Sequence, residues 1–153
     1  MSTIRNHHPP DWPETAMGRS VIVTTARAGT AAVRELRHRL TQALLDWGEQ
    51  DIADVAELLA AELLANAVQH ALPVNSDCAR VTLSAHQDTG SLHVEVADPD
   101  PAPPVMRDAA TDEEGGRGLA LVDALADQWG VAERADGKVV WFSLTSSVPA
   151  VTV

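Results

Sequence analysis

Residues 62–70 read ELLANAVQH and lie within an apolar helical pattern that begins after Asp51, its expected cap, and extends to about Ala71, before Pro73. The pattern is apolar almost all round, so a largely buried helix is expected. At 100° per residue, four polar side chains fall within an arc of roughly 100°: Glu62, Asn66, Gln69 and His70. A charged side chain on a buried helix is costly unless it is paired or faces a wet cavity. The stretch therefore predicts a polar stripe facing a ligand cavity, and a helix edge that meets solvent is the alternative.

Glu62 and Asn66 stand one helical turn apart, which puts both side chains on one face of the expected helix. A carboxylate in such a place suits a general base. A neighbouring amide oxygen suits Mg²⁺, a hard cation that favours oxygen ligands. His70, near the end of the helix, is also a residue that the helix dipole favours there.

Around this helix, the chain alternates between strand and helix patterns. A second helix is expected from Thr30, as its cap, to about Trp47, where Gly48 ends it. A third helix is expected over residues 118–129. Strands are expected over residues 20–26, 80–87, 91–98, 130–134 and 139–145, with hairpin turns at residues 88–90 and 136–137. This order predicts an α+β fold, a two-layer α/β sandwich with helices on one face of a mostly antiparallel sheet.

The expected domain covers residues 18–146, between a flexible leader at 1–17 and a tail at 147–153. Residues 99–116 hold four prolines and an acidic patch and have no helix or strand pattern. Loops of this length inside a compact domain are usually functional lids or disordered segments. A lid over residues 99–116 is therefore the expectation.

Two further stretches flank this lid. Asp98 ends a strand, where its carboxylate could accept a hydrogen bond from an amino group such as that of adenine, or could simply begin a turn before Pro99. Residues 115–121 read GGRGLAL. Their glycines would let backbone N–H groups approach phosphates at a helix N-terminus, with Arg117 as an added cation. A helix entry without a ligand is the alternative.

The charge of the chain limits its partners. It has 11 Lys and Arg against 22 Asp and Glu, a net charge of −11, and residues 51–100 hold a single basic residue, Arg80. This balance argues against nucleic acid and anionic membranes as partners. With one cysteine, Cys78, and no signal-like or membrane-spanning stretch, a cytoplasmic protein is expected.

The three stretches, in this order, resemble the ATPase and kinase superfamily that includes gyrase B, Hsp90 and histidine kinases, which has the Bergerat ATP-binding fold. In particular they resemble its small, single-domain anti-sigma-factor serine/threonine kinases. The matching residues are 62–70 for the N box, 94–98 for the adenine box and 115–122 for the glycine box, and residues 123–130 and 137–141 also look like that subfamily. The resemblance runs from about Ser20 to Leu144.

The resemblance implies ATP and Mg²⁺ as cofactors, with Glu62 as the base that activates an acceptor hydroxyl and Asn66 as the Mg²⁺ ligand. Asp98 would receive the adenine amino group. The implied nucleotide-binding residues are Asn66, His70, Asp98, Gly116, Arg117, Gly118 and Leu119. The implied reaction is phosphoryl transfer from ATP to a serine of a small antagonist protein. Sequestration of a sigma factor by a homodimer is the second implied activity.

Two positions depart from the superfamily pattern. The family often has Asp-x-Gly in the adenine box, and Asp100 stands here at the position of that glycine. Val139 stands where many members have a threonine, so the hydroxyl is missing. These departures motivate a second hypothesis, a non-catalytic ATP-binding regulator that sequesters a protein partner. The scarcity of basic side chains adds an expectation for either function: nucleotide binding should depend steeply on Mg²⁺, with Arg117 and Lys138 among the few cations able to help.

Overall fold

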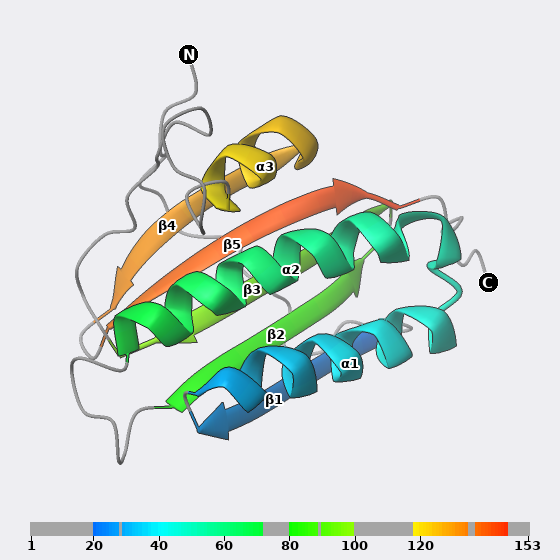
Figure 1. Cartoon of the computed structure of the whole chain (residues 1–153). Helices are drawn as coiled ribbons and strands as arrows, with labels where there is room; N and C mark the ends of the chain where they lie inside the picture. Colours follow the sequence, from blue (N-terminus) through cyan, green and yellow to red (C-terminus); the bar gives the residue numbers. More distant parts are fainter. Residues whose placement is uncertain are drawn as a thin grey trace.

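The computed structural model describes residues 20–27, 29–71, 80–88, 90–99, 118–134 and 137–146. These residues form one five-stranded antiparallel sheet in the order β1-β2-β3-β5-β4, with three helices packed on one face (Figure 1). The elements in chain order are β1 (Ser20–Arg27), α1 (Thr30–Asp46), α2 (Gln50–Ala71), β2 (Arg80–Asp88), β3 (Ser91–Asp98), α3 (Gly118–Leu125), β4 (Gln128–Arg134) and β5 (Gly137–Thr145). The expected α+β, two-layer architecture is confirmed.

The core lies between the sheet and the helices. In β3 burial alternates, and Leu92, Val94 and Val96 are buried on the helix side. In β2, Leu83 and Ala85 pair with Val96 and Val94 and are fully buried on the same side, and Val81, two residues before Leu83, is fully buried as well. Period-two alternation therefore gives β2 and β3 one apolar face, which α2 covers. Within the described ranges, no helix combines the length and the apolar character that a membrane span requires.

The connection between α1 and α2 is a tight glycine turn that makes the two helices antiparallel (Figure 1). Gly48 has a φ of +80° and donates its N–H to the Leu45 carbonyl, while Glu49 donates to the Leu44 carbonyl. This is a Schellman motif, which needs a residue that tolerates positive φ, and it confirms that Gly48 ends α1. The two expected N-caps are wrong, by one position at α1 and by two positions at α2. Gly29 stands at the cap of α1 with no side-chain cap bond, so Thr30 is the first helical residue, and α2 begins at Gln50, so Asp51 lies in its first turn.

The third helix is shorter than expected. It ends at Leu125, and residues 128 and 129 belong to β4. The Asp127 N–H donates to the Ser143 carbonyl of β5, and the Trp129 indole N–H donates to Asp123 Oδ1 at 2.9 Å. Pairing with β5 and burial of Trp129, 5% exposed, therefore override the helical pattern of this segment.

Candidate functional site

The polar stripe expected on α2 is described at two of its four residues, because the side chains of Gln69 and His70 lie outside the described part of the chain. Glu62 and Asn66 are both half-buried and stand one turn apart. On the other flank, Glu57 meets Arg37 of α1, with 3.5 Å between Oε1 and Nε. Five residues at 100° each place Glu62 about 140° around the helix from Glu57. Since α2 lies between α1 and α3 in Figure 1, Glu62 and Asn66 face away from α1 and toward the side of α3.

The end of α2 that carries Asn66 lies over the end of the sheet where β3 finishes and β5 begins (Figure 1). Asp98, the last residue of β3, is therefore at the same end of the fold as the last turns of α2, and Glu62 stands near the middle of that helix. Within the described ranges, no hydrogen bond or ion pair joins Glu62 or Asn66 to Asp98. His70 is in the last turn of α2, and its side chain is outside the described part of the chain.

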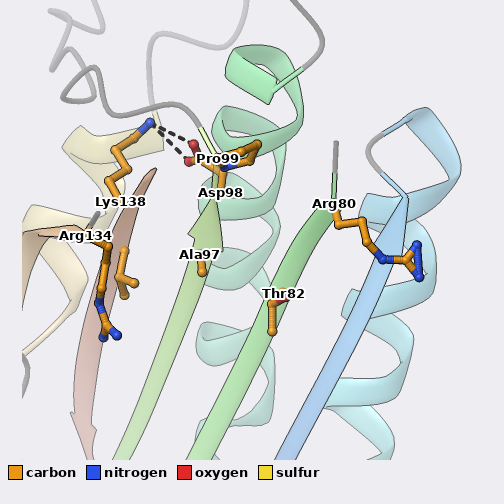
Figure 2. Close-up of a pocket in the computed structure, with 8 residues that line it drawn as sticks. Arg80, Thr82, Ala97, Asp98, Pro99, Arg134 and Lys138 are labelled. Atoms are coloured by element: carbon orange, nitrogen blue, oxygen red, sulfur yellow. Dashed lines mark hydrogen bonds and ion pairs between the residues drawn. The ribbon is translucent and has the colours of Figure 1, made fainter. Parts of the chain in front are cut away.

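Asp98 is the last residue of β3, and its carboxylate forms a buried ion pair with Lys138. Lys138, its cross-strand partner in β5, places Nζ 3.1 Å from both carboxylate oxygens (Figure 2). The two side chains are 2% and 1% exposed. Lys138 had been expected to help neutralise phosphates, whereas in this structure its ammonium group is bonded to Asp98. A buried charge is tolerated only when it is paired in this way.

A glycine fixes the position of this pair. Gly137 precedes Lys138 with a φ of +150°, and a Cβ atom added there would lie only 1.9 Å from the Asp98 carbonyl oxygen. The backbones of β3 and β5 therefore approach so closely that no side chain fits between them. This close approach sets where β3 ends and where Asp98 projects.

A cavity of about 340 Å³ opens beside the ion pair (Figure 2). Its lining also includes Thr82, Ala97 and Val139, which by register lie on the face of the sheet away from the helices. Of the 11 basic residues in the chain, three contribute to this lining: Arg80, Arg134 and Lys138. Because Asp98 also lines the cavity and pairs with Lys138, the net positive charge of the lining comes from Arg80 and Arg134. The volume lies within the roughly 300–1,000 Å³ of small-molecule pockets.

Glu95 lies on the sheet face away from the helices, opposite Trp141 and two residues before Ala97. Burial raises the pKa of this carboxyl, and the positive charge of Arg134 opposes that shift. Desolvation disfavours the charged form of a carboxyl, so Glu95 holds its proton to higher pH than an exposed glutamate does.

The glycine stretch is described only from its last residues. Gly118 and Leu119 open α3, and the Leu119 side chain, 2% exposed, packs in the core. A contact of Leu119 with a nucleotide would therefore use its backbone. Gly116 and Arg117 lie outside the described residues, as do Asp100 and the rest of the expected lid beyond Pro99, the leader, the tail and Cys78.

An oxygen-rich site for Mg²⁺ can be tested against the residues present. Among the described residues, no group of three or more His, Cys, Asp or Glu side chains could hold a metal ion. The Asn66 amide oxygen is nonetheless a ligand of the kind that Mg²⁺ accepts, since this ion keeps several waters and is commonly bound through one or two protein ligands plus substrate phosphates. The residues thus fit a Mg²⁺ ion that arrives with a nucleotide.

The chain was compared with protein families, with curated proteins and with solved structures. Residues 26–144 match the histidine kinase-like ATPase domain. An uncharacterized protein of Streptomyces coelicolor is 48% identical over 54 residues, which are 34% of this chain and 51% of that protein. The chain thus spans about half of that relative.

Two solved structures share the fold. The RsbU and RsbW domains of Rv1364c from Mycobacterium tuberculosis match with a TM-score of 0.61 and 20% identity, covering 88% of this chain and 34% of that one. The histidine kinase domain of a blue-light activated histidine kinase from Erythrobacter litoralis matches with a TM-score of 0.51 and 23% identity, covering 80% and 65%. The family match spans most of the chain and includes α2, Asp98 and α3. This chain belongs to the histidine kinase-like ATPase domain family.

Proposed function

We propose that this chain binds Mg-ATP and transfers its γ-phosphoryl group to a serine or threonine of a small antagonist protein, as an anti-sigma-factor kinase. The observation that carries the proposal is the match of residues 26–144 to an ATPase domain family, and it is supported by a carboxylate and an amide one turn apart on α2, Glu62 and Asn66, and by Asp98 at the end of β3. Each of these side chains is of the type that its proposed role requires.

Asp98 would accept a hydrogen bond from the base, and Asn66 would offer its amide oxygen to Mg²⁺. A bound Mg²⁺ supplies charge neutralisation at the phosphate oxygens. Glu62 would take the proton of the acceptor hydroxyl, and its half-buried flank lets a partner protein reach it. Backbone N–H groups at the start of α3 would receive the phosphates. Positioning and charge stabilisation then account for most of the rate in phosphoryl transfer.

The proposed protein partners are inferred from the similarity in fold to a known structure. One structural neighbour is described as containing RsbU and RsbW domains. An antagonist protein as phosphate acceptor, a sigma factor as sequestered partner and a homodimer as the working unit are therefore parts of this proposal. Net charge −11 suits protein partners with basic surfaces and disfavours nucleic acid.

A second candidate function is a non-catalytic regulator that sequesters its partner. The observation in its favour is the ammonium group of Lys138, which already neutralises the Asp98 carboxylate that a base would use. Nucleotide entry must then alter a buried ion pair.

Phosphoryl transfer to the cognate antagonist, with labelled ATP and Mg²⁺, tests the catalytic proposal. Wild type should label the antagonist, whereas Glu62→Ala should lose most of the rate, roughly 10²–10⁴-fold for a general base. Glu57→Ala, which alters a carboxylate on the α1 flank, is the matched control and should retain the rate. Equal transfer by wild type and Glu62→Ala would refute the role of Glu62, and absence of transfer in wild type would favour the regulator.

A further inference from the structure

Three arginines lie at one end of the sheet, on the face away from the helices. Arg27 ends β1 and is the Cα partner of Arg80, the first residue of β2, while Arg134 ends β4. By register and period-two alternation, all three lie on the same side of the sheet as Thr82 and Val139 of the cavity. In a chain of net charge −11, this end of the sheet is a local concentration of positive charge.

The described residues compensate this charge only in part. All three arginine side chains are exposed, and no ion pair within the described ranges involves any of them. Glu95, further along β3 on the same face, is the carboxyl on which the charge of Arg134 acts. Arg27 and Arg80 stand directly opposite each other, and like charges in that position destabilise a sheet. An anion bound beside these two side chains would remove that cost.

The cavity between the arginines has an apolar floor. Across the strand order β2-β3-β5-β4, its lining passes from Arg80 through Ala97 and Val139 to Arg134. Neighbouring strands are about 4.8 Å apart, so the backbones of the two arginines are separated by roughly 14 Å. Trp141, two residues further along β5 on the same face, is 1% exposed. The accessible part of this face is therefore its end, which suits a small molecule in the cavity of about 340 Å³ better than a second sheet.

We propose that this end of the sheet binds a small organic dicarboxylate at a site separate from the nucleotide site, with Arg27 and Arg80 holding one carboxylate and Arg134 the other. The apolar segment between the two carboxylates would contact Ala97 and Val139. Guanidinium groups bind carboxylates through two parallel hydrogen bonds.

The positions and charges of the side chains suit such a ligand. Figure 2 shows the Arg80 side chain directed toward β1, the strand that carries Arg27, with the helices behind the sheet. Since packing does not fix the exposed side chains of Arg80 and Arg134, each can turn toward a ligand. Three guanidinium charges beside one ionised Glu95 leave two positive charges, which two carboxylates neutralise.

Calorimetric titration of the full chain with suberate, an eight-carbon dicarboxylate, tests the proposal. Octanoate has the same length but one carboxylate, and malonate has two carboxylates but is too short to span the cavity. Wild type should bind suberate saturably and at least about tenfold more tightly than either control, because each control loses the charge-assisted hydrogen bonds at one end. Arg134→Gln should weaken suberate binding by at least about tenfold, to the level of octanoate. Arg34→Gln, at an exposed arginine of α1, is the matched control and should bind suberate as wild type does.

Three results would overturn the proposal: no saturable binding at millimolar suberate, binding no tighter than that of octanoate, or an unchanged suberate affinity in Arg134→Gln. Because Arg134 is exposed, the variant should fold, and circular dichroism checks this. A titration with Mg-ATP at saturating suberate separates this site from the proposed nucleotide site. The affinity for Mg-ATP should stay within about twofold, whereas competition would place suberate in the nucleotide site and overturn the proposal. Suberate binding without any Mg-ATP binding would support this site and contradict the proposed function alone.

Discussion

The buried pair of Asp98 and Lys138 allows a quantitative prediction about stability. At the observed 3.1 Å and an effective dielectric constant of about 20, two unit charges attract by about 5 kcal/mol. Truncation of one partner leaves the other charge buried and unpaired, which costs about 3–5 kcal/mol. Asp98→Ala and Lys138→Met should therefore each destabilise the fold by about that amount, a large fraction of the roughly 5–15 kcal/mol typical of native domains.

The double variant separates the ion pair from the rest of the site. Removal of both charges leaves no buried unpaired group, and replacement of a buried pair by apolar side chains is often close to neutral. Asp98→Ala with Lys138→Met should thus be at least about 2 kcal/mol more stable than either single variant.

Equilibrium unfolding in urea, followed by tryptophan fluorescence, suits this measurement because Trp129 and Trp141 are 5% and 1% exposed. The exposed Arg39–Glu35 pair is the control. It is closer, at 2.9 Å, but its side chains are about half exposed, so Glu35→Ala should cost no more than about 0.5 kcal/mol. If the effects of the two single variants at Asp98 and Lys138 add within about 0.5 kcal/mol, the ion-pair reasoning is refuted.

Two further predictions follow from the same end of the sheet. Gly137→Ala should lower the unfolding free energy by more than about 2 kcal/mol, since its Cβ would overlap the Asp98 backbone, whereas Gly90→Ala, at a φ of +73° with open space around it, should cost only about 1 kcal/mol. Similar midpoint shifts for the two variants in thermal unfolding would contradict the close approach. Burial raises the pKa of Glu95 above its usual 4.5, so the folded chain binds this proton more tightly than the unfolded chain. The unfolding free energy of wild type relative to Glu95→Gln should therefore fall as pH rises from about 4 to about 7, and urea titrations in which this difference stays constant or increases would exclude that environment.

The order of the elements could be predicted because each carries a local signal. Gly48 marks the end of α1, and alternation marks β2 and β3, so these boundaries agree with the structure to within one or two residues. The end of α3 could not be predicted, because the residues after Leu125 continue the helical sequence pattern. In the structure the Asp127 N–H instead donates to the Ser143 carbonyl of β5. A local sequence pattern cannot show that pairing with a distant strand will override helix propensity.

In the candidate site, too, features with a local sequence signal could be predicted, and features that depend on tertiary pairing could not. Glu62, Asn66 and Asp98 were found from polar residues in apolar segments, and their roles remain predictions. The ion pair of Asp98 with Lys138 was missed, because 40 residues separate the two and their pairing depends on the register of β3 with β5. The available signal was Lys138 near the start of an otherwise mostly apolar strand. A lysine that is buried there needs an oppositely charged or hydrogen-bonding partner.

The binding of Mg-ATP is the measurement that tests the central claim most directly. In calorimetry, wild type should bind one Mg-ATP per chain, Asn66→Ala should weaken the binding, and excess EDTA should abolish most of it, because few basic side chains are available to neutralise the phosphates. The expected result is therefore saturable, Mg²⁺-dependent binding that needs Asn66. No binding at millimolar Mg-ATP, or equally tight binding in excess EDTA and by Asn66→Ala, would contradict the account.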